Sequence, residues 1–216
     1  MGERVLDQAQ SAINALINGD LGVAQQVVDR ERNIDYMELD ADEEVFNLIA
    51  KRGPTAVDLR LTLALSKVIG DLERAGDKAA RIARCAIALD YRSSRLPEPK
   101  ILHHIRAMSG VVCRMLTNSL DALARTDVDV ALAVFQDDRS LEQEFDAAMR
   151  HLMTFVFEDP SLVGQVIELV FGLKSLERIG NHAGNIAEQV IYVAKGQDVR
   201  YQNRENLIGA LGQRRP

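Results

Sequence analysis

The sequence predicts an all-α protein made of two tandem three-helix bundles related by internal duplication. Along almost the whole chain, apolar residues recur at the three- and four-residue spacing of amphipathic helices, and the alternation typical of strands is rare. The segment DLERAGDKAARIA, residues 71–83, has a near-copy in SLERIGNHAGNIA, residues 175–187, with seven of thirteen positions identical. A long-range repeat of this kind indicates that one helical unit is present twice.

Turn residues divide the first half of the chain into three helices. The turn at residues 18–20 separates a first helix, about 3–18, from a second, about 20–51. Pro54 opens a third helix, about 54–92, because proline is favoured in the first turn. Long helices joined by short turns pack as antiparallel bundles. In the alignment of the two halves, the first helix begins about eight residues later than its counterpart, so we expect it to be short.

The same order follows a proline-containing linker. A helix of about residues 100–125 and a second one after Thr126 precede a last helix, about 160–195, which Gly196 caps. The polar segment after that glycine is expected to be poorly ordered. The expected division is residues 1–92 for the first repeat, 93–99 for the linker, 100–196 for the second repeat and 197–216 for a polar tail.

Composition narrows the class of protein. The 216 residues are 47% hydrophobic and 27% charged, with a formal net charge of −6 and no strongly basic segment, which disfavours nucleic-acid binding. Cys85 and Cys113 have no CxxC spacing, so we expect reduced core cysteines rather than a disulfide or a zinc-thiolate site. No signal peptide or long apolar stretch is visible, which makes the cytoplasm the simplest location.

Acidic residues one helical turn apart stand out in the repeated segment. Glu73 and Asp77 have i, i+4 spacing, which places both carboxylates on one helix face, where they repel each other. Neighbouring arginines, Arg74 and Arg81, could neutralise such a face in solvent. The other interpretation is a cation held by carboxylate oxygens, and oxygen-only ligands suit Mg, Ca, Mn or iron.

The same spacing occurs at aligned positions of both halves. Candidate metal ligands are the residues of four i, i+4 pairs: Glu31, Asp35, Glu73, Asp77, Asp138, Glu142, Glu177 and Asn181. The last pair combines an acid with an amide. No glutamate is followed three residues later by histidine, which disfavours a ferritin-like di-iron site. Among the scattered histidines, His182 is the one adjacent to a pair.

Glycine lies inside the repeated helix at the same place in both halves. Gly76 and Gly180 each cost about 1 kcal/mol of helix stability relative to alanine, so a neighbouring helix or a ligand is expected to approach there closely. No nucleophile–base signature or phosphate-binding glycine loop is present. An enzymatic function would have to rest on the carboxylate–metal faces alone, as a metal-dependent phosphoester hydrolase.

Four segments resemble the PhoU family, the accessory and regulatory proteins of bacterial phosphate uptake. The most specific resemblance is LERIGNHAGNIAEQVIYVAKGQDVRY, and GPTAVDLRLTLALSKVIGDLERAGDKAARIA resembles the corresponding first-copy run. DRERNID and QDDRSLE fall where the family carries its other acidic pairs. This sequence departs from the family pattern at Asn181 and at Glu142, where aspartate is usual. The family's first helix also usually begins before the position of Met1.

The resemblance implies a non-enzymatic negative regulator with metal-binding E/D-x-x-x-D faces. It implies coupling of a phosphate ABC transporter, through its ATPase subunit, to a phosphate-responsive sensor histidine kinase. The expected metal is Fe, Mn, Mg or Zn, and the protein is expected to be a cytoplasmic homodimer, peripheral to the inner membrane through its partners. The alternatives are the metal-dependent hydrolase, a metal store, or a helical interaction scaffold without metal.

Overall fold

Every secondary-structure element among the described residues is a helix, which confirms the predicted fold class. The computed structural model describes residues 1–89, 97–200, 202 and 206–209. The first half contains α1 (Gly2–Asn18), α2 (Leu21–Asp29), α3 (Glu31–Arg52) and α4 (Ala56–Ala88). The second half contains α5 (Pro99–Arg125), α6 (Val128–Glu158), the 3-10 turn η1 (Pro160–Leu162) and α7 (Val163–Lys195).

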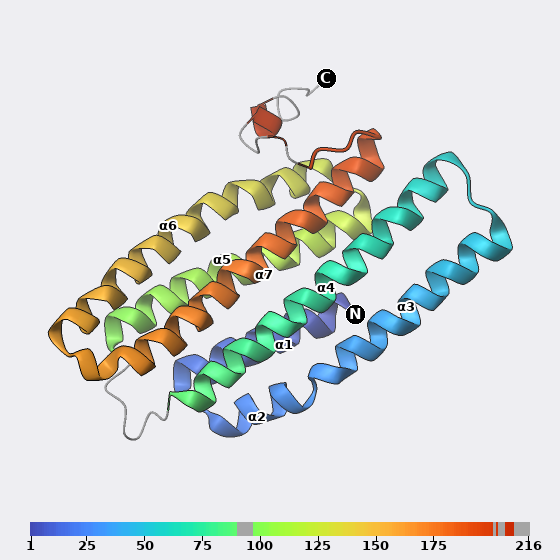
Figure 1. The fold of residues 1–216 in the computed structure, drawn as a ribbon. Coiled ribbons are helices and arrows are strands. Elements are labelled where there is room, and N and C mark those ends of the chain that lie inside the picture. Colours follow the sequence, from blue (N-terminus) through green and yellow to red (C-terminus); the bar gives the residue numbers. More distant parts are fainter. Residues whose placement is uncertain (90–96, 201, 203–205, 210–216) are drawn as a thin grey trace.

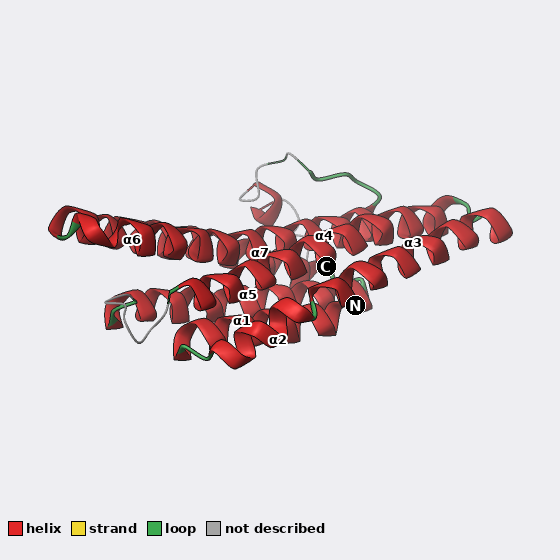
Figure 2. Cartoon of the chain, turned by 60° about the horizontal axis from the view of Figure 1, so that its bottom comes forward, coloured by secondary structure: helices red, strands yellow, loops and turns green. Residues whose placement is uncertain are grey.

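The two longest helices, α4 and α7, lie side by side and antiparallel at the centre of the molecule (Figure 1). Helices α1, α2 and α3 pack on α4, and α5 and α6 pack on α7. In Figure 2, α6, α7, α4 and α3 form one row, with α5, α1 and α2 beneath it. A single cluster of buried apolar side chains runs through both halves, so α4 and α7 join the repeats rather than separating them.

Glycine and aspartate residues at the turns end and begin several of the helices. Gly19, Gly53 and Gly196 terminate α1, α3 and α7 in the left-handed conformation, with φ of 66°, 54° and 70°. Asp20 caps α2 by accepting a hydrogen bond from the backbone nitrogen of Val23 at 3.0 Å. Asp127 caps α6 in the same way at Val130. The short first helix is also confirmed, since α1 has 17 residues and its counterpart α5 has 27.

The helix expected at residues 20–51 is interrupted. Arg30, with φ −90° and ψ −4°, separates α2 from α3: its backbone nitrogen still donates to Gln26 of α2, but its carbonyl accepts from Asn33, three residues on, at 3.0 Å. Because α1 is short, the outer part of α3 runs beside α4 alone (Figure 1). Ile34 is the only buried residue of α3. Little packing therefore holds α3 in line with α2.

Two further boundaries differ from the prediction. Pro54 lies outside the helix that it was expected to open, since α4 begins at Ala56. Pro160 opens the short turn η1 rather than α7 itself. The segment expected as a polar tail also contributes to the core, because Val199 and Leu207 are buried. Part of the linker expected at residues 93–99 and much of the tail lie outside the described residues, and no described helix is long and apolar enough to span a membrane.

Candidate metal centre

The centre lies where α3 crosses α4 at a glycine. A Cβ on Gly76 would lie 2.8 Å from Cδ1 and 3.3 Å from Cγ2 of Ile34, the buried residue of α3. The missing side chain therefore allows the two helices to approach closely, as the sequence predicts. In the second repeat, Gly180 makes the corresponding room for Leu141 and Met115.

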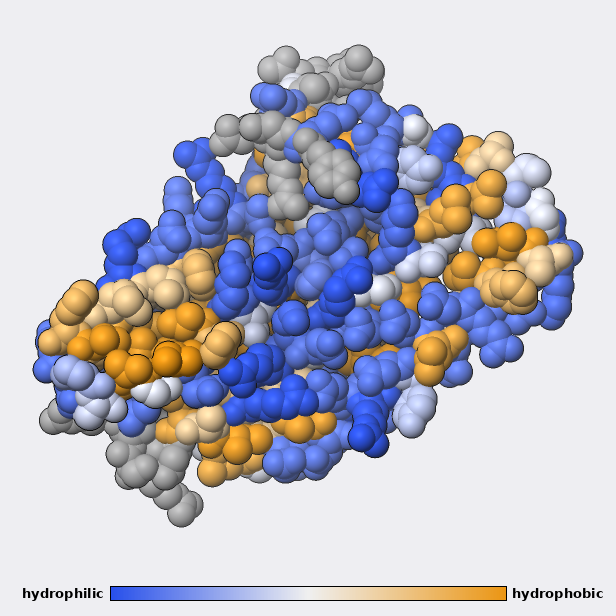
Figure 3. Space-filling view, viewed as in Figure 1, coloured by the Kyte–Doolittle hydropathy of each residue, from blue (hydrophilic) through white to orange (hydrophobic). Residues whose placement is uncertain are grey.

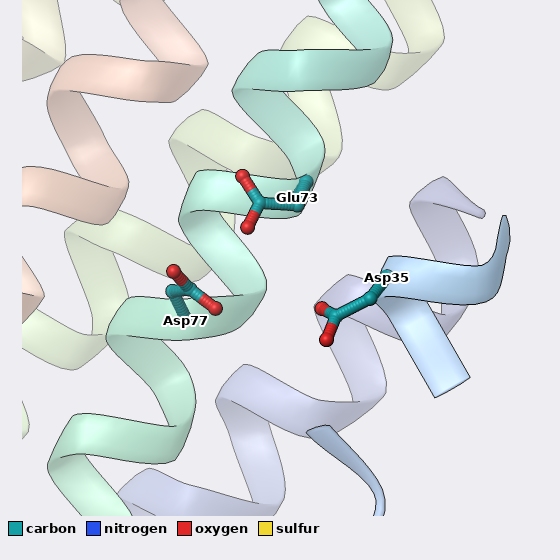
Figure 4. A group of neighbouring side chains, drawn as sticks. All are labelled: Asp35, Glu73 and Asp77. Carbon is teal, nitrogen blue, oxygen red and sulfur yellow. The ribbon is translucent and has the colours of Figure 1, made fainter. Parts of the chain in front are cut away.

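Close approach brings carboxylates of two helices together. Asp35 of α3 faces Glu73 and Asp77, which lie on successive turns of α4 (Figure 4). One oxygen of each carboxylate lies within 4.8 Å of the others. Oxygens bound to one ion at about 2.0–2.5 Å lie no more than about 5 Å apart, so these side chains fit a single hard divalent cation. We call this group the first carboxylate face.

The first carboxylate face carries negative charge that its protein surroundings balance poorly. Partial burial, together with the charges of Asp77, Glu38 and Asp35, raises the pKa of Glu73 to about 7, against the opposing effect of Arg74. Burial and then the charge of Glu31 raise the pKa of Asp77. A cation bound between the carboxylates would remove this repulsion, which is the second reason that the donor set fits a metal.

Two neighbours of this face have different roles. Glu31, expected as a ligand, forms an ion pair with Arg84 and is not one of the three clustered carboxylates. Glu38, one turn beyond Asp35, was not predicted; burial and the charge of Asp42 raise its pKa. Glu38 and Asp42 also have i, i+4 spacing, but the aligned positions of the second repeat are Phe145 and Met149, so a pattern shared by both repeats does not include this pair.

The candidate residues of the second repeat do not form an equivalent group. Glu142 is exposed, Asp138 and Asn181 are half-buried, and Glu177 Oε2 lies 2.5 Å from the ammonium of Lys174. Within the described part of the chain, only the first carboxylate face brings three candidate side chains within bonding reach of one ion. Asp138, Glu142 and Glu177 do not form such a group, and the metal site expected in the second repeat stays a prediction.

Sequence and structure comparisons place the chain in a family. The family model described as "PhoU domain" matches residues 1–86 and again residues 105–190. The chain belongs to the PhoU family. The phosphate-specific transport system accessory protein PhoU homolog of Pseudomonas aeruginosa is 44% identical over 201 residues, covering 93% of this chain and 82% of that protein. The corresponding PhoU of Escherichia coli K12 is 38% identical, with 96% of this chain and 84% of that protein covered.

Solved PhoU structures share the fold. The crystal structure of PhoU from Pseudomonas aeruginosa matches with a TM-score of 0.86 and 43% identity, covering 91% of this chain and 93% of that one. The structure from Streptococcus pneumoniae matches with a TM-score of 0.83 at 24% identity, covering 92% and 91%, which supports the fold alone. The curated relatives are named accessory proteins of the phosphate-specific transport system, which confirms the prediction that this chain is not an enzyme.

This PhoU chain also contains a buried polar network that the sequence did not indicate. Asp71 of α4 is 5% exposed and accepts hydrogen bonds from His182 Nδ1 at 2.9 Å and from Asn185 Nδ2 at 3.0 Å, both of α7. His182 was noted for its position beside Asn181, but it contacts the other repeat. One signal in the sequence could have indicated this network: the two repeats differ here, since Ser175 is aligned with Asp71.

Proposed function

We propose that this protein is a cytoplasmic accessory regulator of phosphate transport, which couples a phosphate ABC transporter to a sensor histidine kinase and keeps the phosphate-starvation response off when phosphate is plentiful. The observation that carries the proposal is the similarity, over nearly the whole chain, to proteins named as accessory to the phosphate-specific transport system. The contacts would be with the ATPase subunit of the transporter and with the kinase, at the inner face of the membrane.

Exposed apolar side chains support a function in protein binding. Figure 3 shows apolar surface at both ends of the molecule, with mostly polar surface between them. At one end, α6 and α7 expose an apolar group of five residues: Met153, Phe157, Val163, Ile167 and Phe171. At the other, α3 and α4 expose Leu39, Phe46, Leu48, Ile49, Val57, Leu59, Leu61 and Leu63. Apolar surface of this extent is typical of contact sites, either with partners or with a second copy in a homodimer.

The first carboxylate face would bind a divalent cation, such as Mn, Fe, Mg or Zn. Asp35, Glu73 and Asp77 would hold the ion, and the ion would supply the positive charge that fixes α3 against α4. The function proposed for the metal is therefore structural: it keeps the α3–α4 end in one arrangement for docking. This assignment rests on the 4.8 Å grouping of the three carboxylates and on the raised pKa of Glu73 and Asp77.

The regulatory function is tested in a bacterial strain that lacks its own relative of this protein and carries a reporter of the phosphate-starvation response. Expression of the chain should restore repression at high phosphate. Phe157→Asp, at a side chain that is 85% exposed, should weaken repression, whereas the matched polar change Glu158→Gln should not. In vitro, the purified chain should bind the transporter ATPase subunit and the kinase, each measured separately. Full expression without repression, together with no binding to either partner, would contradict the proposal.

The metal assignment has its own test. Mn²⁺ should raise the unfolding temperature of the wild-type chain and leave that of Glu73→Gln unchanged. Incubation with Mn²⁺ or Fe²⁺ and a simple phosphate ester should give no turnover. Turnover that disappears in Glu73→Gln would instead favour a metal-dependent hydrolase.

A further inference from the structure

The repeats differ at three positions around their carboxylate faces. With the offset of 104 residues that aligns Glu73 with Glu177, Gly70 corresponds to Lys174 and Asp77 to Asn181. With the offset of 107 that aligns Asp35 with Glu142, Glu38 corresponds to Phe145. Each change either removes an acid from the second repeat or adds a cation to it.

The geometry supports this pairing independently of the alignment. In the first repeat, a Cβ placed on Gly70 would lie 3.5 Å from Nη2 of Arg74 and 3.7 Å from Oε1 of Glu38. In the second repeat, the side chain at the corresponding position, Lys174, extends over the ring of Phe145, with Nζ 5.0 Å from the ring centroid. This position therefore adjoins a guanidinium and an acid in the first repeat, whereas in the second repeat its own lysine covers an aromatic ring.

The lysine also reaches the acid that remains. Lys174 Nζ lies 2.5 Å from Oε2 of Glu177, and this oxygen is buried without hydrogen-bond geometry to any described group. The contact is thus an ion pair, in which the ammonium balances the charge of a carboxylate oxygen closed off from water. The face of the aromatic ring adds a further attraction for the same ammonium.

We propose that Lys174 is a built-in counter-ion of the second repeat, which pairs with Glu177 and so takes the place of a metal ion there, and that this chain binds metal through the first carboxylate face only. The part concerning metal rests on the proposed function. The ion pair itself does not, because it is formed by the chain alone. The chemical basis is charge: in the first repeat, Arg74 lies near the carboxylates but forms its ion pair with Asp71, whereas in the second repeat Lys174 pairs directly with Glu177.

Metal stoichiometry tests the proposal. The probe is Mn²⁺, measured by equilibrium dialysis and metal analysis on the full chain. Saturable binding should be lost in Glu73→Gln and unchanged in Glu177→Gln. A variant that restores the first-repeat pattern, Phe145→Glu with Lys174→Gly and Asn181→Asp, should double the bound metal. Binding that survives Glu73→Gln and disappears in Glu177→Gln would overturn the proposal.

A metal-free measurement distinguishes failure of this inference from failure of the proposed metal function. In EDTA, Lys174→Met should lower Tm by about 2–4 °C, because it leaves a buried carboxylate oxygen without its counter-ion. The matched control Lys100→Met, at an exposed lysine, should shift Tm by less than about 1 °C. If the wild-type chain binds no Mn²⁺, the metal assignment fails, and this comparison alone decides whether Lys174 is the counter-ion. Equal Tm values for Lys174→Met and the wild type would overturn that role.

Discussion

Asp71 of α4 accepts a hydrogen bond of 2.9 Å from His182 of α7 and so joins the two repeats through a buried charge. Arg74, whose Nη2 lies 3.4 Å from Asp71, and Asn185 complete its surroundings. The network lies on α4 two residues before Glu73 of the first carboxylate face. The same helix, α4, therefore contributes both to the contact between the two repeats and to the candidate metal centre.

Asp71→Asn should destabilise the protein by about 1.5–3 kcal/mol, the range for hydrogen bonds to a charged group. Urea unfolding at pH 7 measures the loss. Asp146→Asn, at an exposed aspartate of α6, is the control and should change stability by less than about 0.5 kcal/mol. Equal stability of Asp71→Asn and the wild type would mean that the network does not hold the repeats together.

The advantage of the wild type over Asp71→Asn should also depend on pH. Burial tends to raise the pKa of Asp71, but the hydrogen bonds from His182 and Asn185 outweigh it, so its pKa lies below the ordinary 3.8. A lowered acid pKa stabilises the folded state above the unfolded value and loses that effect as pH falls through the folded value. Unfolding curves from pH 7 to pH 2 should therefore converge at the acid end.

Glu73→Gln should stabilise the metal-free protein above about pH 7. The pKa of Glu73 is raised from 4.5 to about 7, so the folded state retains a proton that the unfolded state has lost between these values. The wild-type chain should then lose stability as pH rises through this window, and the variant should lose less. Thermal unfolding in EDTA at pH 5 and pH 8 measures the difference, with Glu142→Gln as the exposed control. Parallel pH profiles for wild type and Glu73→Gln would contradict the assignment.

Alanine substitutions at two helical glycines should have opposite effects. Gly76→Ala places a Cβ against the stiff, buried Ile34 and should destabilise by about 1–3 kcal/mol. Gly110→Ala meets nothing within 4 Å and should stabilise by about 0.5–1 kcal/mol through helix propensity. Chemical unfolding of both variants tests the pair. A stabilised Gly76→Ala would show that the α3–α4 crossing does not require glycine.

Cys85 should be inert toward thiol reagents in the folded protein. Burial and the charge of Glu168 raise its pKa to about 12, and its thiol donates to the carbonyl of Glu168 at 3.1 Å. Mass spectrometry after a disulfide-exchange reagent at pH 8 should find Cys85 unmodified until urea is added. Rapid labelling in native buffer would indicate that α4 and α7 separate at this point.

Much of the architecture could be predicted because the sequence repeats its strongest signals. The Leu-Glu-Arg-x-Gly turn identified α4 and α7 as equivalent, and Gly76 indicated the close crossing that brings Asp35 to Glu73. The break at Arg30 was missed because helical periodicity continues through it, and the departure reflects packing of the outer part of α3 on α4 alone.

The sequence predicted the carboxylate group of the first repeat, but it did not predict how the candidate ligands of the second repeat are arranged. Spacing alone treats all i, i+4 acids alike, yet Arg84 draws Glu31 into an ion pair and Lys174 neutralises Glu177. Both partners lie outside the acidic motifs. Asp71 was missed for the opposite reason, since its partners belong to the other repeat and no local pattern connects them.

The break at Arg30 and the single buried residue of α3 have a consequence for motion. Separation of the outer part of α3 from α4 would expose little apolar surface. The backbone amides of this part of α3 should therefore exchange with solvent earlier than those of α4. An ion bound between Asp35 and α4 would hold the beginning of α3 against α4. Hydrogen exchange of residues 36–52 would then report whether an ion occupies the first carboxylate face, although Asp35, Glu73 and Asp77 lie outside this segment.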